Sequence, residues 1–301
     1  MLSKESLFLF ATILAILIGF LLPSVADIFF PYVEIILMLT LFFNLFKVNL
    51  DEIKAVLKHP VFISTVSFVK LVFLPVTLYF LTYLIYPKFA VAVLLLTGTS
   101  VGVFAPFMSN LLGARTSVVV ALVIVTSLLV PFTLPTIIYF LLAKETAISL
   151  SGMMLTLAKM IFIPIIAVWF FKKYFKRISE SITKNSFYFS LVLVLFLNSP
   201  VLGHYRDYFV NDLWNFWLVF IIASLFALVN LFLGHYILHK FVKEEFAISS
   251  SISMVFVNNG LMTAFASQYF GPLEASLAVI YSIPYNLMIF PAKWFFGKKD
   301  L

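Results

Sequence analysis

The stretch Gly98-Thr99-Ser100-Val101-Gly102-Val103-Phe104-Ala105-Pro106 interrupts an apolar run that covers residues 88–111. Glycine weakens a helix and Pro106 has no backbone N–H to donate, so this pattern predicts a helix that breaks in its middle. A second apolar run, residues 245–268, carries Asn258-Asn259-Gly260 at its centre. Adjacent amides inside an apolar helix are costly unless they find partners. We therefore expect two interrupted helices.

The composition places both interruptions in a membrane. The 301-residue chain is 63 % hydrophobic and 11 % charged, with a mean hydropathy of +1.12. A soluble domain would be about 45–50 % apolar and about 25 % charged. So few charges cannot cover a surface that faces water, so most of the outer face must meet lipid.

The apolar runs predict an all-α membrane protein with ten transmembrane helices and no soluble domain between them. Polar residues, glycine and proline separate the runs, which cover residues 6–23, 28–46, 60–86, 88–111, 115–142, 149–171, 186–204, 213–239, 245–268 and 272–296.

The basic residues predict the orientation. The side that would hold the N-terminus carries Lys4, Lys47, Lys54, Lys58, Arg115, Lys172, Lys173, Lys176, Arg177, Lys184, Lys240, Lys243, Lys293, Lys298 and Lys299. The other side carries Lys88, Lys144 and Arg206. This split of 15 to 3 predicts a multi-pass protein of the cell membrane with both termini in the cytoplasm. The net charge of +7 lies in these short loops, so it indicates orientation rather than nucleic-acid binding.

The two halves of the chain resemble each other. Lys88-Phe89-Ala90 matches Glu245-Phe246-Ala247, and Ser109–Gly113 matches Ser267–Gly271 at nearly the same offset. We expect one repeat in residues 1–147 and a second in residues 148–301. Because each repeat has five helices, the second must insert upside down, and inverted repeats of this kind are typical of secondary transporters.

The interruptions are the strongest candidates for a binding site. Two broken helices would point two half-helix N-termini at one place near the bilayer midplane, which favours an anion. The structural alternative is a proline kink, with the amides holding helices together. An intramembrane enzyme would need a catalytic cluster, and the apolar runs contain no paired aspartates, metal triad or Ser/His dyad.

Other polar residues in the runs have simpler interpretations. His235 and His239 have the spacing of a metal pair but no third ligand, so we expect no metal site. Asn44 and Asn198 are most simply read as helix–helix contacts. Lys70 lies in the middle of its run, where a lysine cannot easily reach the interface, so a functional role is favoured. The role of Lys159 stays open.

Several motifs resemble the bile acid:sodium symporter family over nearly the whole chain. The stretch Leu45–Ile53 followed by Val56-Leu57-Lys58-His59-Pro60 resembles the second loop of the family. The segment from Gly271-Pro272-Leu273 to Ile280–Asn286 resembles its tenth helix. The resemblance implies a core domain of helices three to five and eight to ten, with helices four and nine broken and crossed. A panel domain of helices one, two, six and seven would face it, and organic anions would bind between the two.

The ion-site residues of the family do not carry over well. Its helix-nine motif Glu-Val-Gly-Met-Gln-Asn aligns with Met254–Asn259, so Met254 replaces the sodium-binding glutamate. Its helix-four motif Gly-Gly-Thr-x-Ser-Asn aligns with Val101–Pro106. A helix-three glutamine that helps to hold sodium lies five residues before a proline, and Lys70 takes that position before Pro75. We therefore expect Lys70, with Asn258, to replace the coupling sodium.

These observations predict a secondary transporter of a small organic anion that works by alternating access. The expected substrate-binding residues are Gly102, Val103, Ala105, Pro106, Asn258, Asn259 and Gly260. No resident cofactor is expected, and coupling to sodium, to a proton or to no ion stays open, as does the oligomeric state. Alternatives are an auxin-efflux-carrier-like or arsenite-permease-like carrier, although the chain has no cysteine for thiol chemistry. A non-transporting receptor or an intramembrane enzyme are the alternatives of another class.

Overall fold

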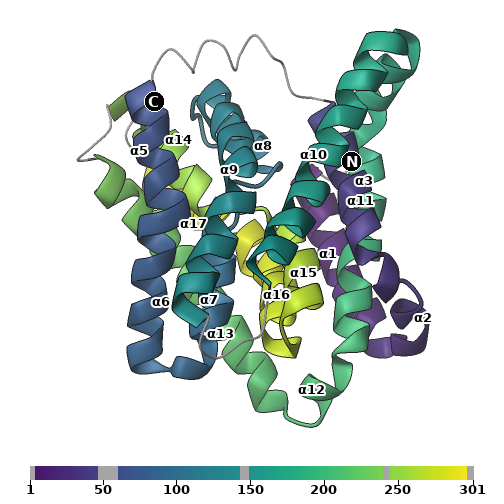
Figure 1. The fold of residues 1–301 in the computed structure, drawn as a ribbon, viewed down its shortest axis with the longest axis vertical. Coiled ribbons are helices and arrows are strands. Elements are labelled where there is room, and N and C mark those ends of the chain that lie inside the picture. Colours follow the sequence, from purple (N-terminus) through teal and green to yellow (C-terminus); the bar gives the residue numbers. More distant parts are fainter. Residues whose placement is uncertain (1–3, 47–59, 143–148, 240–243, 297–301) are drawn as a thin grey trace.

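The computed structural model describes residues 4–46, 60–142, 149–239 and 244–296, and the regular elements among them are helices (Figure 1). The predicted repeat boundary at residues 147 and 148 and the loop motif of residues 47–59 lie outside the described residues. The all-helical fold class is confirmed for the part of the chain that is described.

The first half of the chain forms a series of helices that follow the predicted runs. In chain order they are α1 (Lys4–Leu21), α2 (Pro23–Asp27), η1 (Phe30–Tyr32), α3 (Val33–Leu45), α5 (Pro60–Phe68), the π-helical turn η2 (Val69–Phe73), α6 (Leu74–Ile85), η3 (Pro87–Phe89), α7 (Ala90–Gly98), α8 (Ala105–Leu111) and α9 (Thr116–Leu142).

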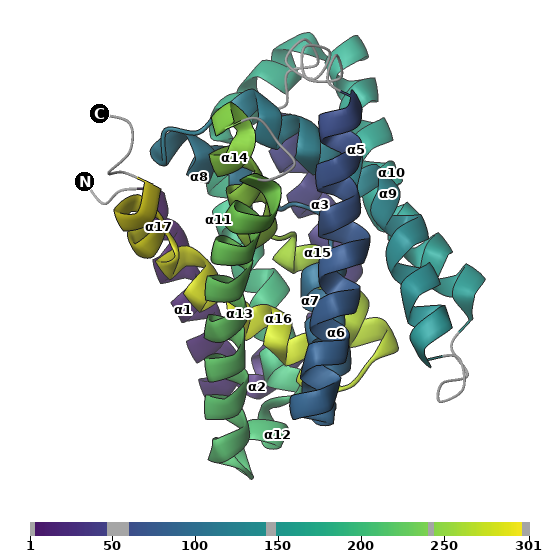
Figure 2. The same ribbon diagram turned by 90° about the vertical axis from the view of Figure 1, so that its left-hand side faces the viewer.

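The second half continues in the same way. Its helices are α10 (Leu150–Tyr174), α11 (Lys176–His204), α12 (Arg206–Val210), α13 (Leu213–His239), α14 (Glu244–Val255), α15 (Asn259–Tyr269), α16 (Pro272–Leu287) and α17 (Ile289–Phe296). The long α13 and the pair α5 and α6 run along most of the height of the bundle (Figure 2).

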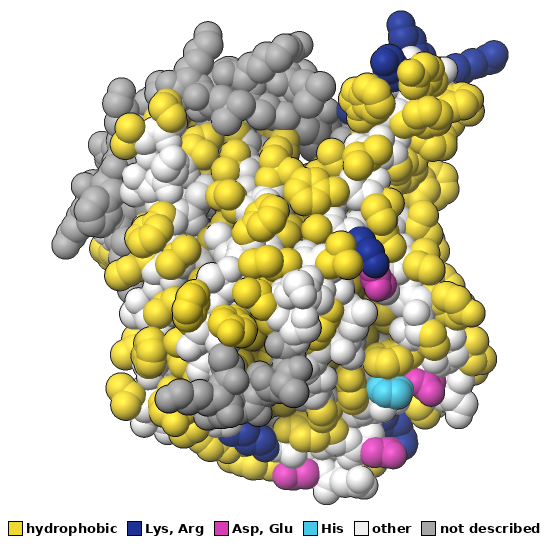
Figure 3. Space-filling model, viewed as in Figure 1, with side chains coloured by type: hydrophobic (Ala, Val, Ile, Leu, Met, Phe, Trp, Pro, Cys, Tyr) yellow, Lys and Arg dark blue, Asp and Glu magenta, His cyan; other side chains and the backbone are white. Residues whose placement is uncertain are grey.

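Seven helical segments of the described chain are long and apolar enough to cross a membrane, and three shorter apolar helices accompany them. Large apolar side chains cover the outside, as Phe140 illustrates with 78 % of its surface exposed. Hydrophobic side chains dominate the face seen in Figure 3, where basic residues project from one end of the bundle. Such a surface is stable only against lipid, so the chain is a multi-pass membrane protein.

The helices pack in two groups. In one group α1 packs on α11, α11 on α3 and α3 on α10. In the other α6 packs on α7, α8 and α14 pack on α9, and α13 packs on α14 and α16. Figure 1 places the first group on the right and most of the second on the left, with α15 and α16 between them.

Both predicted interruptions are present in the structure. Helix α7 ends at Gly98 and α8 begins at Ala105, with Pro106 in its first turn, where a missing N–H costs nothing. Helix α14 ends at Val255 and α15 begins at Asn259. Between each pair of half-helices the chain leaves the α-helix: Val101 and Val257 pair with each other, and Val103 and Phe104 form a turn that leads into α8.

The two interruptions satisfy each other's backbone groups. The N–H of Gly102 donates to the carbonyl of Phe256 at 2.7 Å, and the N–H of Asn258 donates to the carbonyl of Ser100 at 2.8 Å. These two bonds flank an antiparallel bridge between Val101 and Val257. Lipid offers no hydrogen bonds, so each break depends on the other for its partners.

Glycine is required at position 102 by this close approach. A Cβ atom there would collide with the carbonyl oxygen of Val257 and would lie 3.0 Å from that of Phe256. We predict that Gly102→Ala lowers the apparent melting temperature in detergent by several degrees, because such overpacking costs about 1–3 kcal/mol. The matched control is Gly152→Ala, whose new Cβ would meet its nearest neighbour, Ser149 Cβ, at 3.4 Å. Equal melting temperatures for the two variants would contradict the prediction.

Candidate functional site

A cavity of about 600 Å³ opens beside the paired interruptions. Helices α1, α3, α8, α11, α15 and α16 all contribute to its wall. The lining consists of Phe8, Thr12, Leu37, Thr40, Leu41, Asn44, Gly102, Val103, Phe104, Pro106, Phe107, Asn110, Thr116, Val120, Phe187, Ser190, Val194, Leu197, Asn198, Val257, Asn258, Asn259, Gly260, Ser282 and Tyr285. Its volume lies within the range of small-molecule sites, which is about 300–1,000 Å³.

The described lining contains no charged side chain. Its polar groups are amides and hydroxyls, and they include Asn44, Asn198, Asn258, Asn259 and Ser190. Amides and hydroxyls can both donate and accept hydrogen bonds, so they can orient a polar ligand without fixing the sign of its charge. The helix starts favour a negatively charged ligand. The first turns of α8 and α15 lie at the cavity, and a helix N-terminus carries partial positive charge.

The structure brings six of the seven predicted substrate residues together in this lining: Gly102, Val103, Pro106, Asn258, Asn259 and Gly260. Ala105 is the exception, since it is fully buried and is absent from the lining. It begins α8 next to Pro106, and successive residues of a helix point in different directions, so its methyl group packs into the protein interior.

Asn258 holds the second interruption together. Its side-chain oxygen accepts from the N–H of Leu261 at 3.2 Å and thereby caps α15. Its amide nitrogen donates to Ser100 Oγ at 3.3 Å, across the pairing. Both ends of the side chain are therefore engaged within the protein, and an N-cap of this kind stabilises a helix by about 1 kcal/mol.

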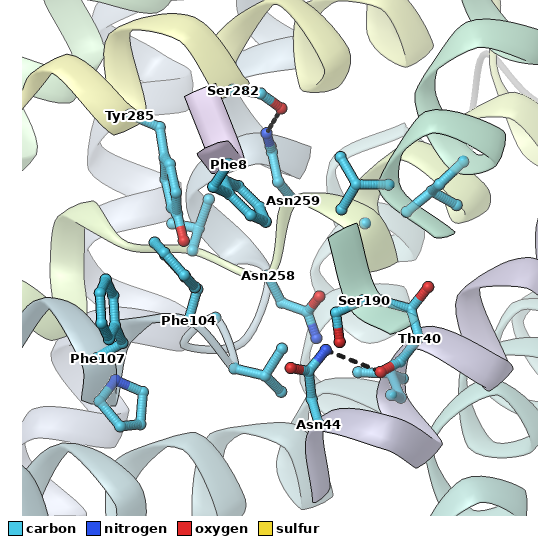
Figure 4. Close-up of a pocket in the computed structure, with 18 of the residues that line it drawn as sticks. Phe8, Thr40, Asn44, Phe104, Phe107, Ser190, Asn258, Asn259, Ser282 and Tyr285 are labelled. Atoms are coloured by element: carbon cyan, nitrogen blue, oxygen red, sulfur yellow. Dashed lines mark hydrogen bonds between the residues drawn. The ribbon is translucent and has the colours of Figure 1, made fainter. Parts of the chain in front are cut away.

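Asn259 is more available to a ligand. Its amide nitrogen donates to Ser282 Oγ at 2.7 Å, whereas its Oδ1 is buried with no hydrogen-bond partner among the described residues. The hydroxyl of Ser282 can donate or accept, so the amide can turn to present either its oxygen or its nitrogen. Figure 4 shows Asn259 and Ser282 together on one side of the cavity.

Lys70 lies outside the cavity lining, in the π-helical turn η2, and only 1 % of it is exposed. Its ammonium group donates to the carbonyl oxygen of Thr97 at 2.6 Å. Thr97 precedes the last residue of α7, so the lysine supplies a donor to a carbonyl at the point where the helix stops. Among the described residues no hydrogen bond joins Lys70 to Asn258, the residue expected to replace sodium together with it.

Several lining residues were not predicted from the sequence. Asn44 and Asn198 were expected to join helices, but both face the cavity, and Asn44 also donates to the carbonyl of its own helix at Thr40. Phe8 and Phe104 were not singled out at all. The spacing within one helix shows which residues share a face, but it does not show which helix that face will meet.

No group of three or more metal-ligating side chains gathers within the residues that the structure describes. The ring of His235 packs edge-on against Phe295 at 5.2 Å between centroids, and the side chain of His239 lies outside the described residues. Lys159 is exposed on α10 and does not reach the cavity.

Comparison with known proteins shows which family the chain belongs to. The model of the sodium bile acid symporter family matches residues 34–212, which is more than half of the chain. The chain belongs to the sodium bile acid symporter family. It is therefore a membrane transport protein, in agreement with the helices long enough to span a bilayer.

A curated relative extends the family match over most of the chain. A Bacillus subtilis (strain 168) protein named "Uncharacterized sodium-dependent transporter YocS" is 22 % identical over 275 residues. The alignment covers 90 % of this chain and 84 % of that protein. The similarity to that protein thus extends over most of the chain rather than through one segment.

A buried methionine lies where the family resemblance implies a sodium-binding glutamate. Met254, which aligns with that glutamate, is fully buried. A Cβ atom on Gly234 of α13 would lie 2.9 Å from Met254 Cγ, so α13 packs closely over this position. The thioether of methionine is a poor ligand for a hard cation such as sodium.

We predict that Asn259→Ala weakens binding of a transported anion by about tenfold to a hundredfold, because a hydrogen bond to a charged group contributes about 1.5–3 kcal/mol. Ligand affinity and uptake into proteoliposomes would both be measured. The matched control is Asn185→Ala, an exposed asparagine that bonds only to the Ser181 carbonyl of its own helix. Full uptake by well-expressed Asn259→Ala protein would contradict the assignment of Asn259 to the site.

Proposed function

We propose that this chain is a secondary active transporter that carries a small organic anion by alternating access. The observation that carries the proposal is the position of the half-helix starts. Helices α8 and α15 both begin at the paired interruptions and at one cavity. Their partial positive charges favour an anion, and the described lining adds no charge of either sign to oppose it.

The proposed architecture is ten spans in two inverted repeats. The three shorter apolar helices, Ser6–Leu21, Pro87–Gly98 and Phe246–Val255, fall in the first, fourth and ninth predicted runs, so together with the seven longer segments they would make ten. The bonds from Gly102 to Phe256 and from Asn258 to Ser100 are reciprocal about one bridge. Such a pairing is what a twofold axis between the repeats would produce.

The two packing groups support a division into moving parts. The group of α1, α2, α3, α10 and α11 would form the panel, and the remaining helices would form the core that carries both interruptions. The cavity takes side chains from each group, for example Asn198 from α11 and Asn258 from the second interruption. Relative movement of the groups would then expose the ligand to one side of the membrane at a time.

The basic residues support the proposed orientation. Lys172, Lys173, Lys176 and Arg177 gather at the junction of α10 and α11. On the proposed topology this end of the bundle faces the cytoplasm, and Lys88 and Arg206 mark the opposite end.

Two reporters would be fused after Leu301: green fluorescent protein and alkaline phosphatase. We predict that only the fluorescent protein is active there, because the C-terminus lies in the cytoplasm. Green fluorescence would mark a cytoplasmic end, and alkaline phosphatase activity would mark an external one. The control fusion ends after Arg206, which should report the outside. Phosphatase activity from the full-length fusion would overturn the orientation, because an even number of spans places both termini together.

In this proposal the ammonium group of Lys70 replaces the sodium ion to which transport would otherwise be coupled. Its ammonium group donates a hydrogen bond to a buried carbonyl at the end of α7, where the partial negative charge of a helix C-terminus would also attract a sodium ion. The competing expectation comes from the Bacillus relative, whose name describes it as sodium-dependent. If the ammonium group exchanged its proton during the cycle, uptake would instead follow a pH gradient.

The test is uptake into proteoliposomes with sodium replaced by choline. We predict sodium-independent flux for the wild type and, for Lys70→Gln, flux that is lost or becomes sodium-dependent. The matched control is Lys159→Gln, which removes an exposed lysine and should behave like the wild type. Wild-type flux that collapses in choline would overturn the replacement by Lys70, whereas binding without flux under any condition would indicate a receptor.

A further inference from the structure

The cavity has two unlike ends. The side chains of Thr40, Asn44, Ser190 and Asn258 gather at one end, and four aromatic rings gather at the other (Figure 4). The aromatic end is formed by Phe8 of α1, Phe104 of the first interruption, Phe107 of α8 and Tyr285 of α16. We use the name aromatic end for these four residues.

The rings of the aromatic end are arranged in layers. Phe8 and Phe104 are stacked, with their centroids 4.5 Å apart and their planes 14° from parallel. Phe107 lies 5.0 Å from Phe104 and Tyr285 lies 6.5 Å from it, tilted by 40° and 32°. Neither Phe107 nor Tyr285 therefore stands perpendicular to Phe104.

The layers are supported from outside the cavity. Tyr285 is almost fully buried and packs edge-on against Phe256 at 4.9 Å. The backbone carbonyl of Phe256 accepts the hydrogen bond from Gly102. Phe256 therefore takes part both in the pairing of the interruptions and in the support of the aromatic end. Phe8, Phe104 and Phe107 keep part of their surface exposed to the cavity. Simple core packing would bury these rings as completely as Phe256.

The stack also joins two separate parts of the bundle. Phe8 belongs to α1, which packs on α11, whereas Phe104 belongs to the interruption between α7 and α8. A flat ring has the same shape and the same π surface as the side chain of Phe8. It can therefore stack on Phe104 wherever Phe8 moves aside, and stacked aromatic pairs gain affinity beyond the area that they bury.

We propose that the preferred ligand is an aromatic carboxylic acid, with its ring held at the aromatic end and its carboxylate directed to the amides and the start of α15. This inference rests on the proposed transport of an organic anion and specifies the chemical class of that anion. Phe104 is the main specificity-determining residue, and Phe8 is the ring that the ligand replaces or covers.

The experiment compares two acids that differ only in aromaticity. Binding of phenylacetate and of cyclohexylacetate to the purified full chain in detergent would be measured by calorimetry. Both have the same carboxylate and a six-membered ring, and the saturated ring of cyclohexylacetate is the more hydrophobic, so tighter binding of phenylacetate cannot come from charge or from hydrophobic burial. We expect phenylacetate to bind about two- to twelvefold more tightly to the wild type.

Three variants test whether the preference for phenylacetate depends on the stacked rings. Phe104→Leu should reduce the ratio of the two affinities to about one while it changes the affinity for cyclohexylacetate little. Phe8→Leu tests the same stack from another helix and covers the case in which Phe104→Leu does not fold. The control is Phe216→Leu, which alters a remote ring cluster with Phe20 and Phe209 and should keep the wild-type ratio.

The outcomes separate this inference from the proposed function. Equal affinity of the wild type for both acids, no binding of phenylacetate, or an unchanged ratio in both stack variants would overturn the inference. Binding with the expected preference but no flux into proteoliposomes would overturn transport and leave the ligand class standing. Flux of aliphatic anions with no preference for aromatic ones would overturn the ligand class and leave the proposed transport standing.

Discussion

The reciprocal backbone bonds between the two interruptions are the constraint on which the rest of the structure depends. A helix that stops inside a bilayer leaves N–H and carbonyl groups without partners, and lipid cannot supply them. Here the N–H of Gly102 and the N–H of Asn258 each find a carbonyl on the other interruption. Each break thus takes hydrogen-bond partners from the other, and this pairing holds α7, α8, α14 and α15 together beside the cavity.

The carbonyl ends of the broken helices are satisfied by side chains from neighbouring helices. Lys70 donates to Thr97 at the end of α7, and the hydroxyl of Tyr281 donates to Val255 at the end of α14 at 2.8 Å. The carbonyl at the end of each half-helix thus accepts a hydrogen bond from a different kind of group: an ammonium group in the first half of the chain and a phenol in the second. The opposite ends of the breaks, the starts of α8 and α15, lie at the cavity, and Asn258 caps the start of α15.

The sequence predicts the local features of this site well and its assembly poorly. Glycine, Pro106 and the adjacent amides mark the breaks because their effect on a helix is local. The sequence also predicts Ala105 in the site, but this residue is buried on the side of α8 that faces away from the cavity. Phe8 and Asn198 were missed since they join the cavity only when α1 and α11 pack against the interruptions. Such a meeting depends on tertiary packing, which no spacing within one helix encodes.

The absence of charge in the described lining has an electrical consequence for transport. In the proposed transport cycle, charges that stay fixed to the protein would move forward and back and would contribute nothing to the net current. The ligand would then be the charge that crosses the membrane. A potential of 100 mV, negative inside, opposes the entry of a monovalent anion by about 2.3 kcal/mol. Without a coupling ion, the membrane potential itself would favour export of the anion over its accumulation.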